Sequence, residues 1–175
     1  MLRSIVTMMV LVIAFAARAT LPTDITPTAS RKPLPEVALT DSKGAPVNLS
    51  AYKGRVVLLD FWATWCEGCK EEIPWFTEFQ DKYNKTGLTV VGASLDDDGW
   101  KSVMPYLRED KINYRIVLGT FESAKQFGVD KGMPVALLID RDGKLADLHT
   151  GMVDKAAFER EIQELLKEPA KNTAR

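Results

Sequence analysis

The sequence predicts an α/β fold in which helices flank a mixed central β-sheet, preceded by an N-terminal β-hairpin extension. Continuous apolar runs typical of buried strands recur along the chain, as in VVLLDF and LTVVGAS. Segments with a helical spacing of apolar residues separate these runs, and the chain closes with a hairpin and one more helix. This order of elements indicates a sheet with both parallel and antiparallel pairs.

The first elements lead from the hairpin to the cysteines. Apolar residues on both sides of a turn predict the hairpin: Val37 and Leu39, then Ser42-Lys43-Gly44, then Val47 and Leu49. Residues 55–62 predict a buried strand that runs directly into two cysteines. Helix-forming residues follow, and Pro74 is expected to kink that helix.

The second half of the chain continues the alternation. Strands are predicted at residues 88–94, 114–118, 135–139 and 145–149, the last two joined by a tight turn at 140–143. A short helix is predicted at 122–127, which Gly128 should end. Two amphipathic helices are predicted from Trp100, Val103, Met104 and Leu107, and from Phe158, Ile162, Leu165 and Leu166 after an Asp154 cap.

Residues 1–19 are typical of a secretory signal peptide. Arg3 supplies a positive flank, residues 5–17 carry no charge, and Ala17-Arg18-Ala19 fits an A-x-A cleavage site. The apolar run is short for a membrane span, which needs roughly 20 residues, and an uncleaved membrane anchor is the alternative. In both cases the rest of the chain is expected in an exported, periplasmic compartment where disulfide chemistry operates.

The remaining chain divides into three parts. Residues 20–35 are rich in Pro and Thr and are interpreted as an extended linker, 36–168 as the folded domain, and 169–175 as a C-terminal tail. The composition, 46% hydrophobic and 27% charged, suffices for a full core without a disulfide. The net charge of -1 and the absence of a basic run give no electrostatic case for nucleic-acid binding.

Cys66 and Cys69 are the only cysteines in the chain. Cys66 is expected where a strand ends and a helix begins, so the unpaired amides and the dipole of the helix should favour its thiolate. Cys69 lies one helical turn later on the same face and should be more buried. This arrangement predicts a redox pair in which one thiol attacks and the other resolves the mixed disulfide.

Two other interpretations of the cysteines are weaker. A zinc half-site of this spacing needs a second pair of ligands, and the chain has no other cysteine and one histidine, so no metal is expected. A purely structural disulfide would close a loop too short to constrain the unfolded chain much. His149 is interpreted as a surface residue at a strand end, and Asp96-Asp97-Asp98 as a solvated loop.

The segment FWATWCEGCKEEIP resembles the active site of thioredoxin-fold proteins, in particular the exported thiol-disulfide oxidoreductases of the TlpA/ResA type. The resemblance extends over residues 35–166, and EVALTDSKGAPVNLSAYKG looks like that subfamily's N-terminal hairpin. GMPVALLIDRDGKLADLHTG resembles the strand of the family that begins at a cis proline. By resemblance, Met133-Pro134 is a cis peptide beside the cysteines and binds the backbone of the partner; an ordinary turn is the alternative.

The resemblance also assigns two carboxylates to the site. Asp60 occupies the position of thioredoxin's buried aspartate, where burial should raise the pKa and the carboxylate would take the proton of Cys69. Glu72 matches the glutamate of the pattern C-x-x-C-K/R-x-E-x-P. The alternatives are that the strand ends early and leaves Asp60 in water, and that Glu72 is a solvated helix residue.

The residues around the cysteines are candidates for substrate contact. Many relatives have proline at Gly68, and glycine there should loosen the turn. Glu67 brings a negative charge close to Cys66, which should raise the pKa of that thiol and make the protein a stronger reductant. Trp62 and Trp65 flank the motif, either as substrate contacts or as packing residues.

The sequence therefore predicts an exported reductase of protein disulfides that needs no cofactor beyond the Cys66–Cys69 pair. The resemblance implies a membrane thiol-reductant donor, and substrates in cytochrome c maturation or copper-oxidase assembly. A dithiol oxidase and a redox-silent partner-binding module are the alternatives. A thiol peroxidase fits less well, because such enzymes usually carry T-x-x-C and Ala63 stands three residues before Cys66.

Overall fold

The computed structural model describes residues 23–170, so the expected signal peptide, the start of the linker and residues 171–175 lie outside the described range. Six strands form one sheet in the order β1-β4-β3-β2-β5-β6. The strands are β1 Leu39–Thr40, β2 Val56–Trp62, β3 Leu88–Ser94, β4 Arg115–Gly119, β5 Val135–Ile139 and β6 Leu145–Thr150. The helices are α1 Glu67–Tyr83, α2 Trp100–Glu109, α3 Phe121–Ala124 and α4 Lys155–Lys167.

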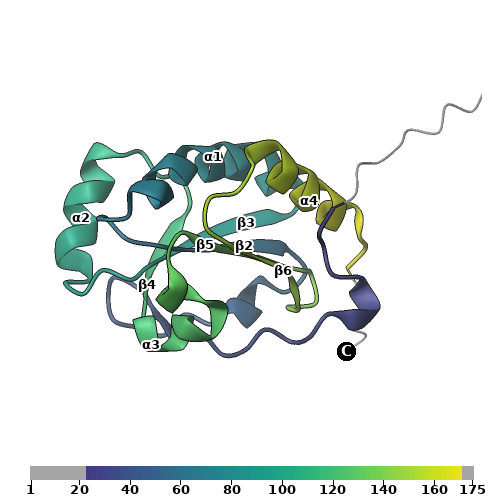
Figure 1. Ribbon diagram of the computed structural model, residues 1–175, viewed down its shortest axis with the longest axis horizontal. Coiled ribbons are helices and arrows are strands. Elements are labelled where there is room, and N and C mark those ends of the chain that lie inside the picture. The colour runs from purple at the N-terminus through teal and green to yellow at the C-terminus, as the bar shows by residue number, and fades with distance from the viewer. Residues whose placement is uncertain (1–22, 171–175) are drawn as a thin grey trace, which may run out of the picture.

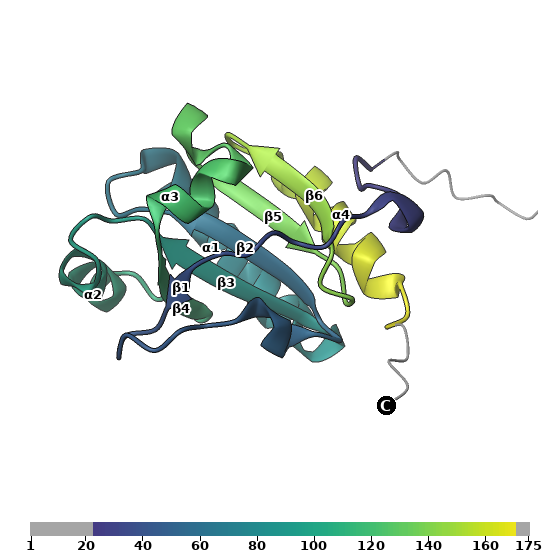
Figure 2. The ribbon, with the colours of Figure 1, turned by 90° about the horizontal axis from the view of Figure 1, so that it is seen from below.

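The sheet is mixed, as the sequence predicts. Strands β2, β3 and β4 are parallel, whereas β1, β5 and β6 each pair antiparallel with their neighbours. Helices α1 and α4 cover one face, α3 lies on the other, and α2 lies at one end of the molecule (Figure 1). Figure 2 shows the α3 side, with the parallel strands at the centre of the sheet.

Strand β2 occupies the centre of the molecule, and all seven of its residues are buried. Alternation along a strand sends successive side chains to opposite faces. Val57, Leu59 and Phe61 accordingly pack in the core on the α3 side, and Val56 and Leu58 pack in the core beneath α1 and α4. The same alternation places Asp60 on the α1 side, among apolar neighbours.

The N-terminal hairpin is present in reduced form. Its turn closes with a single bridge between Thr40 and Pro46, and β1 pairs mainly with β4. Pro46 has no N–H to continue a ladder. The expected second strand is replaced by a 3₁₀ helix at Leu49–Tyr52, whose first turn is capped by the Asn48 side chain.

Residues 23–35 differ from the predicted extended linker, because they pack against the domain. Arg31 is buried, donates to both carboxylate oxygens of Glu168 at 2.6 and 2.7 Å, and donates to Asp140 at 3.1 Å. The backbone of Lys32 accepts a hydrogen bond from Leu145. Composition alone suggests a linker, but a guanidinium with two carboxylate partners and backbone pairing hold this segment in place.

Helix α2 buries a narrower face than its spacing predicts. Val103 is fully buried and Trp100 and Leu107 are partly buried, whereas Met104 is exposed. The helix lies at the end of the sheet rather than across it, so only one row of its side chains reaches the core (Figure 1). The short helix α3 continues as a 3₁₀ turn at Lys125–Phe127 and ends at Gly128, whose φ of 90° favours glycine.

Candidate active site

Cys66 and Cys69 form a disulfide at the start of α1, directly after β2. Cys66 is the N-cap residue of the helix, and the Cys69 N–H donates to its sulfur at 3.2 Å. Cys66 is 6% exposed and Cys69 is fully buried. The predicted placement and order of burial are confirmed: Cys66 lies at the helix N-terminus and keeps a small exposed fraction, whereas Cys69 has none.

The loop between β2 and α1 is held by Asp96. Its carboxylate accepts hydrogen bonds from the Thr64 N–H at 3.0 Å, the Thr64 hydroxyl at 2.6 Å and the Ser94 hydroxyl at 2.8 Å. Asp96 is buried, so the prediction of a solvated Asp96-Asp97-Asp98 loop is wrong for its first residue, while Asp97 and Asp98 are exposed. The sequence did carry a signal for this contact. Asp96 and Thr64 each follow a predicted strand, and the carboxyl ends of the adjacent parallel strands β2 and β3 meet at one edge of the sheet.

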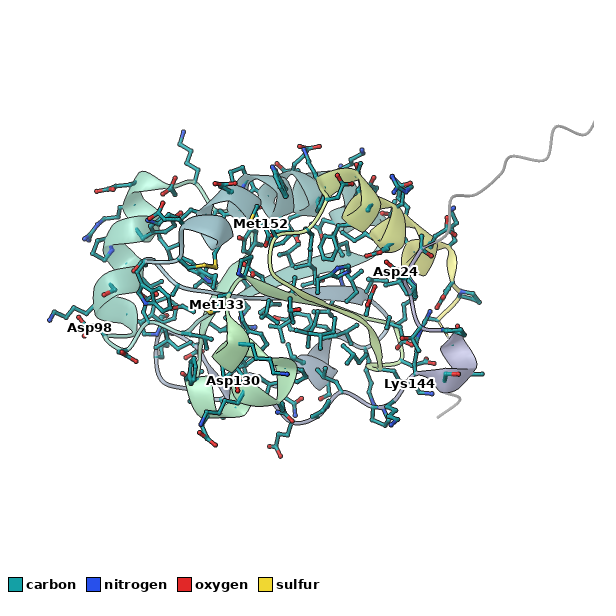
Figure 3. All side chains as sticks on the ribbon, viewed as in Figure 1. Asp24, Asp98, Asp130, Met133, Lys144 and Met152 are labelled. Atoms are coloured by element: carbon teal, nitrogen blue, oxygen red, sulfur yellow. A yellow bond between two sulfur atoms is a disulfide. The ribbon has the colours of Figure 1, made fainter. Side chains whose placement is uncertain are left out.

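The Met133–Pro134 peptide is cis, and it lies against the cysteine motif. A Cβ built on Gly68 would be 3.1 Å from Pro134 Cδ and 3.2 Å from Met152 Sδ. The Pro134 carbonyl accepts a hydrogen bond from the Gly151 N–H at 2.8 Å. Met133 packs with the buried cysteines (Figure 3), and Met152, which sequence reasoning missed, completes this side of the site.

Asp60 is fully buried, and both of its carboxyl oxygens lack a hydrogen-bond partner among the described residues. Burial raises the pKa of this carboxyl well above its usual value, and the nearby charge of Glu72 raises it further. The alternative of an early strand end with Asp60 in water is excluded, since β2 continues to Trp62.

Glu72 is also buried, so the alternative of a solvated helix residue is excluded. Its Oε1 accepts a hydrogen bond from the Val153 N–H at 3.0 Å, and its Oε2 has no partner among the described residues. Burial raises the pKa of Glu72 to about 7, against the opposing effects of the Val153 N–H and of His149. Glu72 therefore titrates near neutral pH, one helical turn after Cys69.

Two further buried side chains with polar atoms, those of Trp62 and Tyr114, lie near the β3 residue that pairs with Asp60. Asp60 lies beside Gly92 on β3, and a Cβ on Gly92 would be 3.1 Å from both Trp62 Nε1 and a ring carbon of Tyr114. Burial raises the pKa of Tyr114 well above its usual value, with smaller contributions from nearby acidic groups, Asp60 first among them. Gly92, the β3 partner of Asp60, thus leaves room for the side chains of Trp62 and Tyr114.

Glu67 and the two tryptophans occupy different environments. The Glu67 side chain is 82% exposed and pairs with Lys70 at 2.8 Å. The predicted effect of its charge on Cys66 is therefore offset by a neighbouring ammonium. Trp62 is fully buried against Tyr106, which makes it a packing residue, whereas Trp65 is 64% exposed beside Cys66.

His149 is not the surface residue that the sequence suggests. Its side chain is mostly buried, its Nε2 lies 2.8 Å from Glu161 and 3.3 Å from Asp147, and its ring packs edge-on against Phe158. Burial lowers the pKa of His149, but hydrogen bonds to Asp147 and Glu161 outweigh it and raise the pKa to about 9. These three side chains also bring potential metal-ligating atoms within 4.8 Å of one another, and the proton on His149 competes with that use.

A family model described as Redoxin matches residues 29–166. The chain belongs to the Redoxin family. Among curated redoxin relatives, the thiol-disulfide oxidoreductase ResA of Geobacillus kaustophilus is 29% identical over 131 residues, 75% of each chain. The ResA of Bacillus subtilis is 28% identical over 122 residues, which is 70% of this chain and 68% of the relative.

Solved structures agree with this assignment. A Chlorobium tepidum protein assigned as a thiol:disulfide interchange protein DsbE is 36% identical, with a TM-score of 0.71 over 78% of this chain and 96% of its own. A second Chlorobium tepidum thiol:disulfide interchange protein is 28% identical, with a TM-score of 0.65 over 78% of this chain and 97% of its own.

The redoxin described here is thus a thiol-disulfide oxidoreductase of the thioredoxin fold, of the ResA type, with Cys66 and Cys69 as its cysteine pair. The resemblance of the motif to that group is confirmed. None of the helices within residues 23–170 combines the length and hydrophobicity needed to cross a lipid bilayer.

Proposed function

We propose that this redoxin is an exported reductase of protein disulfides. The Cys66 thiolate attacks a substrate disulfide, so that a Cys66–substrate bond forms and one substrate sulfur leaves as a thiolate. Cys69 then attacks Cys66, which releases the second substrate thiol and forms the Cys66–Cys69 disulfide. A membrane thiol donor would return two electrons to that disulfide.

The observation that carries the proposal is the inequality of the two sulfurs. Cys66 keeps a small exposed fraction, and its sulfur accepts a hydrogen bond from the Cys69 N–H, an arrangement that stabilises negative charge on sulfur. Cys69 has no access to solvent, so it is available only for the second, internal step. A thiol peroxidase is disfavoured, because such an enzyme needs a threonine hydroxyl near the reactive sulfur, and the hydroxyl of the neighbouring Thr64 donates to Asp96 instead.

Asp60 and Glu72 are proposed to serve the second step. A carboxylate with a raised pKa is a better proton acceptor, and a buried one can take the Cys69 proton directly or through water. The charge of Glu72 raises the pKa of Asp60 further, so that Asp60, once ionised, is a stronger base for the Cys69 proton. Trp65, Glu67, Gly68, Met133 and Pro134 are proposed to face the substrate.

The cellular setting rests on sequence. The signal-like residues 1–19 support export, with cleavage after Ala19 or retention as an anchor. The resemblance of the cysteine motif to TlpA/ResA-type proteins is the basis for proposing substrates of the kind used in cytochrome c maturation or copper-oxidase assembly. The runner-up functions are a dithiol oxidase and a redox-silent module that only holds a partner.

The first test is the equilibrium reduction potential of the Cys66–Cys69 pair in the chain that begins at Thr20. We expect a value below about -200 mV, typical of reductants, whereas a value near -120 mV would indicate an oxidase. Cys69→Ala is expected to trap substrates as mixed disulfides, and failure to trap any would favour the redox-silent module.

The second test concerns the proton acceptor. Asp60→Asn should leave the first attack unchanged but lengthen the lifetime of the mixed disulfide, by about tenfold or more if proton transfer to Asp60 assists resolution. Rapid acid quench and mass spectrometry separate the two steps. An unchanged lifetime would remove Asp60 from the mechanism without changing the direction of the reaction.

A further inference from the structure

Met152 lies in a short segment that is fixed to the active site on both sides. The Gly151 N–H donates to the carbonyl of Pro134 at 2.8 Å, and the Val153 N–H donates to Glu72 at 3.0 Å. The residue between these anchors is therefore held beside the cis proline and beside the first turns of α1.

The Met152 side chain covers Gly68. A Cβ at position 68 would lie 3.2 Å from Met152 Sδ and 3.7 Å from its Cγ, which is tighter than an ordinary contact for the sulfur. The same Cβ would lie 3.1 Å from Pro134, a buried ring that cannot easily move. Glycine between the cysteines thus gives the thioether the space that a side chain at that position would fill.

Met152 nevertheless remains 47% exposed, on the side of the molecule where the disulfide lies (Figure 3). Trp65, which precedes Cys66, is 64% exposed. Two large apolar side chains are therefore exposed at the cysteine motif, Trp65 beside Cys66 and Met152 over Gly68, although such residues are normally buried. The Glu67 carboxylate, which follows Cys66 in the chain, pairs with Lys70.

We propose that Met152 is a specificity-determining residue, which contacts the partner residue next to the reacting cysteine and favours an apolar one. Trp65 precedes Cys66 and Met152 covers Gly68 between the cysteines, so a polypeptide whose cysteine reaches Cys66 would meet both side chains. The thioether is flexible and polarisable, so it can adapt to aliphatic neighbours of different shape. Met152 takes no part in the exchange of electrons.

This inference rests on the proposed function only in that Cys66 is the sulfur that exchanges with the partner. It applies equally to a reductase and to an oxidase, because the same mixed disulfide forms in both directions. The reduction potential and the peptide selectivity therefore test the two proposals separately.

The experiment uses two neutral pentapeptides whose single cysteine is joined to 2-nitro-5-thiobenzoate, one with leucine and one with glutamine on both sides of the cysteine. Reduced protein carrying Cys69→Ala attacks the peptide sulfur, forms the Cys66–peptide disulfide and releases the coloured thiolate, so absorbance gives the rate constant. The small disulfide 5,5′-dithiobis(2-nitrobenzoate) reports the intrinsic reactivity of Cys66.

We expect the leucine peptide to react about fivefold faster than the glutamine peptide. This ratio corresponds to the free energy of burying part of one apolar side chain. Met152→Gln should bring the two peptide rates to within about twofold of each other while the small disulfide reacts as before. Met104→Gln, which changes an equally exposed methionine on α2, is the matched control and should retain the preference.

Three outcomes would overturn the proposal. The first is that the parent protein reacts with both peptides at the same rate, and the second is that the Met152→Gln protein keeps the same preference as the Met104→Gln protein. The third is that Met152→Gln lowers the rate constants for both peptides and the small disulfide by the same factor, which would indicate a role in the shape of the site rather than in selection.

Discussion

Asp96 accepts hydrogen bonds from both the N–H and the hydroxyl of Thr64, at 3.0 and 2.6 Å. The two residues lie at the carboxyl ends of adjacent parallel strands, and Thr64 stands two positions before Cys66. One buried carboxylate therefore fixes the loop that presents the reactive sulfur. Charged acceptors make stronger hydrogen bonds than neutral ones, so this contact should be important for both stability and geometry.

Asp96→Ala is expected to lower the free energy of unfolding by about 2–3 kcal/mol, since it leaves the Thr64 N–H and the Ser94 hydroxyl without their acceptor. Urea unfolding of the oxidised protein measures this. The neighbouring Asp97 is exposed, so Asp97→Ala serves as the control and should change stability by less than about 0.5 kcal/mol. Equal effects of the two substitutions would contradict the assigned role.

Glu72 should make stability depend on pH. Its pKa is about 7 in the folded protein, whereas the ordinary value is 4.5. Between pH 4.5 and pH 7 the folded state therefore binds a proton that the unfolded state has released. Stability should therefore fall as pH rises from 4.5 to 7. Glu72→Gln, which keeps the acceptor for Val153, should remove about 2 kcal/mol of that fall. Denaturation at pH 5 and pH 8 checks this, and parallel profiles for both proteins would refute it.

His149 is the only histidine in the chain, so its proton NMR signal gives its pKa without assignment. We expect a pKa of about 9, because the hydrogen bonds to Asp147 and Glu161 outweigh burial. The corresponding stability is fully present below pH 6.5 and is lost as pH rises through 9. Glu161→Gln should lower the His149 pKa, and a value near 6.5 in the unmodified protein would show that the imidazolium is not held between the two carboxylates.

Arg31 should tie the N-terminal segment to the domain. Its side chain is 1% exposed, so Arg31→Ala leaves the buried Asp140 carboxylate without its ion-pair partner and should lower the free energy of unfolding by about 3 kcal/mol. Lys32→Ala is the matched control, because Lys32 is exposed and contributes its backbone to the pairing with β6. If both variants unfold at the same urea concentration, residues 23–35 act as the linker that composition suggests.

Glu67 and Lys70 should have opposite effects on Cys66. Glu67→Gln removes a negative charge and should lower the pKa of the Cys66 thiol, and Lys70→Gln should raise it by exposing that charge. Each substitution should change the pKa of the Cys66 thiol by less than about one pH unit, since the Glu67 carboxylate is largely exposed to water. Thiolate absorbance at 240 nm against pH in the reduced protein measures both, and no difference between the variants would remove Glu67 as a determinant of the potential.

Local sequence determined the elements of this protein. Strands β3 and β5 have the predicted bounds, Asp154 caps α4 through the Ala157 N–H, and Cys66 caps α1. Hydrophobic runs, capping residues and glycine stops act over a few residues, so they can be interpreted without knowing the fold. The cysteine motif was equally local, and it sufficed to indicate the chemistry.

Contacts between distant segments were decided only by the tertiary structure. Asp96 meets Thr64 across two strands, Met152 reaches Gly68 from the loop before α4, and His149 is enclosed by α4. Arg31 likewise donates a hydrogen bond to Glu168, which lies at the other end of the domain in the sequence. The environment of each polar side chain depends on which remote groups the fold brings within hydrogen-bond reach, and residue spacing carries no information about these. The sequence by itself thus determined that the protein carries a redox cysteine pair between a strand and a helix, and the fold decided which buried carboxylates and which thioether surround it.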